Sequence, residues 1–204
     1  MNKLEELMKE PIRATGTVDI TAAADDGKED GNKAMKINAY NGGLISVGWG
    51  IPVGIELSGL AWREDSSIPI LCLHDTHSID AICGQSKKIT ADGNSLNVEA
   101  EFMPVTDEAK KIHALAKAGY KFQASVGVKA DDVLYVGANE SAMLNGAEIK
   151  GECYIVRAGT LNEVSIVPLG ADGTTNTAIA AAQTKGKEGE MPEVKKTVEA
   201  ARPT

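Results

Sequence analysis

Aromatic side chains, cysteines and positive charge are all scarce in this 204-residue chain, and each scarcity excludes a class of protein. Phe, Trp and Tyr make up 4% of the residues, so the core must be built from Val, Ile, Leu and Ala. The net charge of −8 argues against nucleic acid as the main partner, because phosphate binding needs a basic surface. Three cysteines without a CxxC pair fit a reducing cytosol better than a disulfide framework: Cys72, Cys83 and Cys153.

Long hydrophobic runs are also missing from the chain. No run approaches the ~18 apolar residues of a membrane-spanning helix, so we expect no membrane partner. Residues 1–7 are too polar for a signal peptide. The contents of 43% hydrophobic and 25% charged residues are typical of a soluble globular protein. The length allows one ordinary domain with an appendage.

Short strand-like segments predict a mainly β fold. Alternating apolar residues, or adjacent turn signals, indicate strands at residues 12–21, 34–40, 81–89, 95–103 and 120–130. The continuous apolar run at residues 68–73 is typical of a strand buried on both faces. Residues 44–61 indicate one or two strands around a bend at Pro52. After a polar insert at residues 131–145, the last two strands are expected at residues 147–158 and 161–167.

Two helices and a tail complete the expected architecture. A short helix is expected at residues 3–9, followed by a loop at residues 24–32. A longer helix begins at the N-cap Thr106 and stops near Gly119. The fold class is therefore α+β but mainly β, an antiparallel β-barrel or sandwich with peripheral helices. We expect one domain over residues 1–178, and a flexible charged tail or linker over residues 179–204, which has few large apolar residues.

Three strings carry side chains with catalytic chemistry. His74 and His77 follow the apolar run in residues 73–77 (LHDTH). Ser125 lies in an alternating segment and shares one strand face with Gly127. Glu163 lies in the expected strand at residues 161–167, on the face that also carries Leu161, Ser165 and Val167. Nucleophile, base and acid are the parts of a hydrolytic triad, which is recognised by geometry rather than by chain order.

Each of these residues also has a common structural explanation. A serine on a strand face is usually a surface residue, and an acid among apolar strand residues commonly lies at a wet edge. The third histidine, His113, fits a half-buried or exposed helical position. The His-x-x-His spacing would suit zinc, but only Asp75 and Asp80 lie nearby as further ligands. We therefore expect no metal and no other cofactor.

In order and spacing, the strings resemble the tailed-phage prohead maturation proteases over residues 49–178. The matching elements are residues 73–75 (LHD), an isolated helix, residues 123–127 (QASVG), and residues 162–168 (NEVSIVP) followed by Ala171. The resemblance implies a herpesvirus-protease-like barrel and a serine endopeptidase without a cofactor. It also implies action inside the prohead, in the host cytoplasm, on scaffold and major capsid proteins and on the chain itself.

Carried over by motif, Ser125 is the nucleophile, His74 the base and Glu163 the orienting acid. His77 is the alternative base or third member, because it lies in the same loop as His74. Backbone N–H groups are the expected oxyanion donors, with Arg157 as a weak candidate. Ser165 is the next candidate nucleophile.

Two rival functions stay open at this point. One is a non-enzymatic scaffold or capsid-assembly protein with the same barrel, which would use its acidic surface and tail for assembly. The other is a metal-dependent hydrolase that uses His74 and His77.

Overall fold

The computed structural model describes residues 11–20, 32–46, 50–64, 66–168 and 178–179, which fold mainly as β-strands with one α-helix among them. The mainly β fold class is therefore confirmed. The strands are β1 (Ile12–Ile20), β2 (Lys33–Tyr40), β3 (Val53–Ile55), β4 (Leu60–Ala61), β5 (Pro69–Cys72), β6 (Ile82–Ala91), β7 (Leu96–Phe102), β8 (Gln123–Val136), β9 (Ser141–Leu144), β10 (Ala147–Lys150), β11 (Cys153–Val167) and β12 (Ala178–Ile179). The helical segments are η1 (Leu57–Gly59), η2 (Ile79–Ala81) and α2 (Asp107–Lys117).

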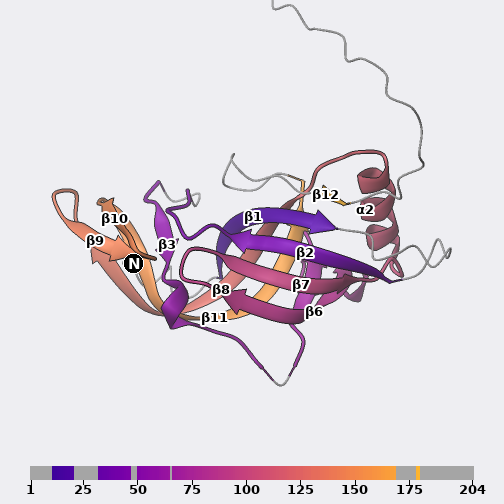
Figure 1. Ribbon diagram of the computed structural model, residues 1–204, viewed down its shortest axis with the longest axis horizontal. Coiled ribbons are helices and arrows are strands. Elements are labelled where there is room, and N and C mark those ends of the chain that lie inside the picture. The colour runs from indigo at the N-terminus through magenta and orange to yellow at the C-terminus, as the bar shows by residue number, and fades with distance from the viewer. Residues whose placement is uncertain (1–10, 21–31, 47–49, 65, 169–177, 180–204) are drawn as a thin grey trace, which may run out of the picture.

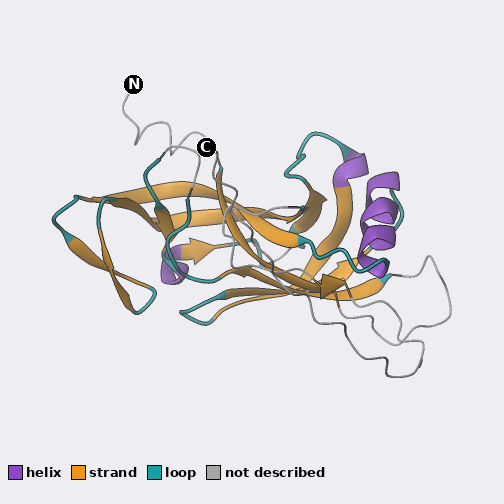
Figure 2. Ribbon diagram, turned by 90° about the horizontal axis from the view of Figure 1, so that it is seen from above, coloured by secondary structure: helices purple, strands orange, loops and turns teal. Residues whose placement is uncertain are grey.

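The main sheet curls on itself (Figures 1 and 2). Its strands pair in the order β1-β2-β7-β6-β5-β11, and β8 pairs with both β11 and β1, so the hydrogen-bonded neighbours form a circuit. The shorter strands β3 and β4 pair with other parts of β11, and β12 pairs with the end of β1. The two long strands β8 and β11 pair with each other along most of their length.

Most strand pairs of the main sheet are antiparallel, but β11 departs from this expected pattern. This strand runs parallel to β3, β4 and β5, and antiparallel only to β8. A parallel pair needs a long crossover, and the chain between β5 and β11 contains all of β6 to β10. The sheet is therefore mixed.

The expected boundaries near the end of the domain are also wrong. Residues 131–136 of the expected polar insert continue β8, because β11 pairs with them along its first residues. Residues 147–150 belong to the separate β9–β10 hairpin. No break divides β11 at Gly159 and Thr160; instead the register shifts around Ala158 and Gly159, which are β-bulge positions.

The helix α2 agrees with the sequence at both of its ends. The Thr106 side chain accepts a hydrogen bond from the backbone N–H of Ala109, and Gly119 follows the helix with φ of +93°. Three residues of one helix face are buried: Ala109, Ile112 and Ala116. Leu115 is 49% exposed, although its helical spacing from Ile112 also fits that face. The helix lies at one end of the long axis, opposite the β9–β10 hairpin (Figure 1).

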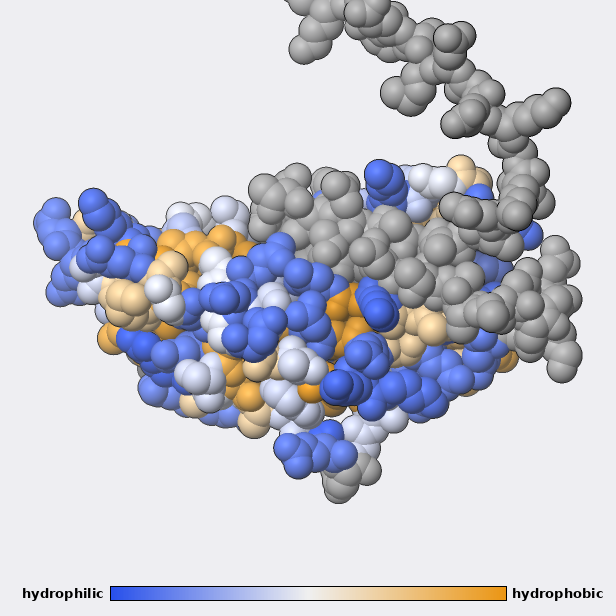
Figure 3. Space-filling model, in the orientation of Figure 1, coloured by the Kyte–Doolittle hydropathy of each residue, from blue (hydrophilic) through white to orange (hydrophobic). Residues whose placement is uncertain are grey.

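The hydrophobic core is built mainly from aliphatic residues, as the scarcity of aromatics predicts. Its members on the two long strands include Val126, Val128, Val164 and Ile166. On the outside, the face seen in Figure 3 is largely hydrophilic, with smaller apolar areas between the charged ones.

Several expectations fall on other parts of the chain. The short helix at residues 3–9, most of the loop at residues 24–32 and the tail beyond Ile179 lie outside the described residues. Within the described part, no helix is both long and apolar enough to cross a membrane.

Tyr40 supplies a first test of the core, because its hydroxyl is buried and doubly bonded. It donates to the carbonyl of Gly43 and accepts from the backbone N–H of Ile55 at 3.0 Å, and burial raises its pKa to about 12. Tyr40→Phe leaves both backbone groups unpaired, so we expect a loss of about 1–3 kcal/mol in the free energy of unfolding, measured in urea. Tyr135 is 45% exposed, and its hydroxyl bonds the exposed Glu152 carboxylate at 2.5 Å rather than buried backbone groups, so Tyr135→Phe is the matched control. Equal urea midpoints for the two variants would contradict the expectation.

Candidate active site

A row of buried polar residues crosses the middle of β8 and β11. Ser125 is directly opposite Ser165 in the antiparallel register, and Gly127 is opposite Glu163. Directly opposed residues project to the same face of a sheet, so these four share one face. Their sequence neighbours Val126 and Val164 lie in the hydrophobic core on the other face. The three polar side chains are nonetheless buried, with 2% of Ser125, 4% of Glu163 and none of Ser165 exposed.

A β-bulge sets the direction of Glu163. The register shifts by one residue between Leu161 and Glu163, so that Asn162 has no partner on β8. Leu161 therefore lies in the core opposite Val128, while Glu163 projects to the polar face. The expectation that Leu161 and Glu163 share a face is wrong for this reason.

Gly127 leaves the space that the Glu163 carboxylate occupies. A Cβ atom at Gly127 would lie 2.3 Å from Glu163 Oε1, far inside contact distance. A glycine two residues after Ser125 indicates room for a close approach on the same strand face. The group that occupies this room is the Glu163 side chain.

His74 reaches the same carboxylate from a turn at the end of β5. Leu73 and His74 both have left-handed backbone conformations, with φ of 57° and 60°. The parallel pairing of β5 with β11 puts this turn beside Ser165. His74 Nδ1 then lies 2.7 Å from Glu163 Oε1, and the two side chains are only 9% and 6% exposed. The carboxylate therefore fixes the ring orientation and the Nδ1–H tautomer.

Ser165 bonds the second carboxylate oxygen of Glu163. Its hydroxyl donates to Glu163 Oε2 at 2.6 Å and accepts from the backbone N–H of His74 at 3.1 Å. Each carboxylate oxygen of Glu163 thus has a hydrogen-bond partner, and the hydroxyl proton of Ser165 already takes part in one of these hydrogen bonds. This arrangement fits a positioning residue better than the alternative nucleophile that the sequence allows.

Ser125 lies beside the pair but is not hydrogen-bonded to it. Neither His74 nor any other described residue makes a hydrogen bond with its hydroxyl. The same holds for Nε2 of His74, the ring nitrogen that does not face Glu163. Catalytic hydrogen bonds are often long in an empty site and tighten only when substrate binds. The structure therefore brings His74 and Glu163 into contact and leaves Ser125 on the neighbouring strand.

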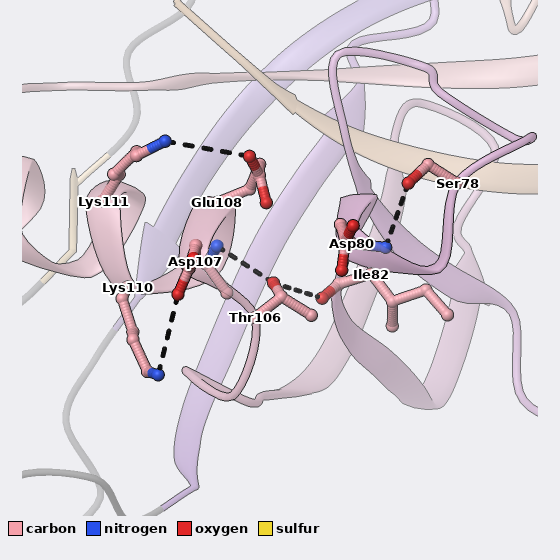
Figure 4. Close-up of polar contacts among 9 residues, drawn as sticks. Ser78, Asp80, Ile82, Thr106, Asp107, Glu108, Lys110 and Lys111 are labelled. Atoms are coloured by element: carbon pink, nitrogen blue, oxygen red, sulfur yellow. Dashed lines mark hydrogen bonds and ion pairs between the residues drawn. The ribbon is translucent and has the colours of Figure 1, made fainter.

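The loop at residues 73–82, which we call the His74 loop, is tied down along its length. The carboxylate of Asp75 accepts from the backbone N–H groups of His77 and Ser78. Figure 4 shows the next two links: the hydroxyl of Ser78 accepts from the backbone N–H of Asp80, and Thr106 donates to the carbonyl of Ile82 at 3.3 Å. The N-cap of α2 thus anchors the far end of the loop.

His77 itself is exposed in this loop. No group of three or more His, Cys, Asp or Glu side chains arranged for a metal is found among the described residues. The geometry therefore gives no support to a metal site built on His74 and His77.

Arg157 does not belong to the site. Its guanidinium bonds Glu56 Oε2 at 2.7 Å, and it lies eight residues from Ser165 along β11, about 26 Å in an extended strand. It is therefore too distant to serve as an oxyanion donor.

Sequence reasoning missed Arg13, which lies much nearer. On β1, Arg13 is opposite Gly127. Thr15, two residues further along β1, is opposite Ser125. Arg13 is exposed and has no ion pair with the described residues. A cation on the face that holds Ser125 is a candidate group for binding an oxyanion or a substrate carboxylate. Only the pairing of β1 with β8 identifies it, and no local motif does.

Comparisons with known proteins give no relative: no protein-family model, no curated protein and no solved structure matches the chain. Residue geometry and the three motifs therefore carry the functional proposal.

Gly127→Ala tests whether Glu163 depends on the missing side chain. The new methyl group collides with the carboxylate, so we expect a loss of about 1–3 kcal/mol in the free energy of unfolding. Gly43→Ala is the control, because a Cβ there meets nothing within 4 Å.

A double-mutant cycle shows whether the collision is with Glu163. In a Glu163→Ala background the methyl group has room, so Gly127→Ala should destabilise the protein far less there. An equal loss in both backgrounds would show that Glu163 is not what Gly127 accommodates.

Proposed function

We propose that this chain is a serine endopeptidase of the prohead-maturation type, with a herpesvirus-protease-like barrel. The observation that carries the proposal is the buried contact between His74 Nδ1 and Glu163 Oε1, with Ser125 on the adjacent strand of the same face. These are the residues that the resemblance assigns as base, acid and nucleophile.

The proposed reaction uses each of these groups once. Ser125 Oγ attacks the scissile carbonyl carbon while His74 Nε2 accepts its proton. Glu163 stabilises the imidazolium, and Ser165 keeps the carboxylate in place. His74 then gives the proton to the leaving amine, and water hydrolyses the acyl-enzyme by the same route in reverse. Backbone N–H groups, assisted by Arg13, are the proposed donors to the oxyanion.

The proposed substrates are phage scaffold and major capsid proteins, together with the chain itself. They follow from the resemblance, as does the interior of the prohead in the host cytoplasm as the place of action. A tail at residues 179–204 that links the protease to scaffold would raise the effective concentration of substrate at the site.

A non-enzymatic capsid-assembly role is the second candidate. The observation that favours it is the lack of a hydrogen bond between Ser125 and His74 in the described structure. An assembly protein would need the barrel and its acidic surface but no activated serine.

A fluorophosphonate probe separates these two functions without knowledge of the substrate. The probe forms a covalent adduct with an activated serine, so mass spectrometry should locate it on Ser125 in the wild type. Ser125→Ala should show no adduct and no cleavage of its own chain when expressed alone. Ser165→Ala, the matched serine on β11, should be labelled more slowly but still on Ser125. An adduct on Ser165, or wild-type cleavage by Ser125→Ala, would refute the assignment.

The two histidines of the His74 loop give a second test. His74 contacts Glu163, whereas His77 is exposed, so only the first can pass a proton within a supported site. We expect His74→Ala to lower the labelling rate by about 100-fold or more, and His77→Ala to change it little. Circular dichroism checks that both variants fold. The reverse order of effects would move the base to His77.

A further inference from the structure

Two of the three cysteines lie beside the candidate site on adjacent strands. Cys72 is the last residue of β5, two positions before His74, and is partly buried. Cys83 is the second residue of β6 and is fully buried. In the antiparallel register, Ile70 is opposite Gly84 and Leu71 is opposite Ile82, so Cys83 is the extra residue of a β-bulge. Cys72 packs against the core cluster that contains Cys83.

The two thiols differ in chemistry. The Cys83 thiol donates to the carbonyl of Ala81 at 3.5 Å; turned toward a thiolate at Cys72 on the adjacent strand, the same S–H group lowers the pKa of Cys72 to about 7. The hydrogen bond to Cys72, together with burial, raises the pKa of Cys83. At neutral pH a large fraction of Cys72 is therefore a thiolate, the nucleophilic form, while Cys83 keeps its proton.

We propose that Cys72 and Cys83 form a redox modification site, at which a low-molecular-weight disulfide such as oxidised glutathione switches the candidate active site off. The Cys72 thiolate attacks one sulfur of oxidised glutathione, forming a mixed disulfide and releasing one glutathione thiolate. Cys83 then loses its proton and attacks the Cys72 sulfur, which releases the second glutathione thiolate. Counted from two protein thiols, the protein loses two electrons and two protons, one of them on ionisation of Cys72, and oxidised glutathione becomes two molecules of glutathione.

The disulfide acts on the turn that carries His74. The carbonyl of Cys72 accepts a hydrogen bond from the backbone N–H of Asp75 at 3.2 Å and so closes this turn, in which both central residues have positive φ. A disulfide imposes its own Cα separation and side-chain dihedral on Cys72. A strained turn tolerates little change at its base, so the ring of His74 should leave Glu163. This consequence for activity rests on the proposed function, whereas the modification itself does not.

Mass spectrometry of the intact full-length chain tests the modification alone. The chain is incubated with oxidised glutathione, quenched with acid and alkylated after denaturation. Wild type and Cys153→Ala, whose missing cysteine is buried in a separate small cluster, should both lose two alkylatable thiols without retaining glutathione. Cys83→Ala should stop at one glutathione adduct on Cys72, and Cys72→Ala should acquire none. A wild type that keeps both thiols, or retains the adduct, would overturn the proposal.

Two further measurements complete the test. We expect iodoacetamide to alkylate Cys72 of the wild type in a fast phase near pH 7. The Cys83→Ala variant should lose this fast phase, because the thiol that favours the Cys72 thiolate is gone. Labelling of Ser125 by the fluorophosphonate should fall by about 100-fold in the oxidised wild type and recover with dithiothreitol. A disulfide that forms without slowing a labelled serine refutes the switch. A disulfide in a chain that never labels refutes the proposed function and leaves the modification site standing.

Discussion

The buried carboxylate of Glu163 is the constraint on which the rest of the site depends. A carboxylate removed from water is unfavourable unless hydrogen bonds replace its hydration. Here His74 Nδ1 lies 2.7 Å from one carboxylate oxygen, and Ser165 Oγ donates a hydrogen bond of 2.6 Å to the other. The surrounding backbone is arranged to allow this. The bulge at Asn162 directs the side chain away from the core, and Gly127 leaves it room.

Such a contact is easier to explain by chemistry than by folding. Replacing buried charged and polar partners with well-packed apolar residues is often neutral or stabilising, so the contact between His74 and Glu163 is weak evidence of a purely structural role. It also needs a bulge, a missing side chain and two left-handed residues in a row at Leu73 and His74, each of which is unfavourable in isolation. An imidazole held by a carboxylate and adjacent to a serine supports the endopeptidase proposal over an assembly protein.

The sequence alone identifies the parts of this site but not their assembly. Alternation, caps and turn residues predict the mainly β class, the helix after Thr106 and the three strings, since each of these is a local pattern. The contact between His74 and Glu163 joins residues 89 positions apart and depends on β5 lying parallel to β11. No local pattern encodes that pairing, or the bulge at Asn162 that reverses the faces of Leu161 and Glu163. Arg13 was missed for the same reason, because only strand register places it opposite Gly127.

Of the three expected catalytic side chains, His74 alone lies outside a strand. Ser125 and Glu163 are fixed by the ladder between β8 and β11, which breaks only when the sheet unfolds. His74 depends on a few hydrogen bonds at one turn, from the backbone N–H groups of Leu73 and His74 to β11 and from Asp75 to Cys72. Local opening there needs far less free energy than global unfolding. The proposed activity and the stability of the fold should therefore be separable, because a change at Cys72 or in the His74 loop can displace His74 while the barrel-like sheet stays intact.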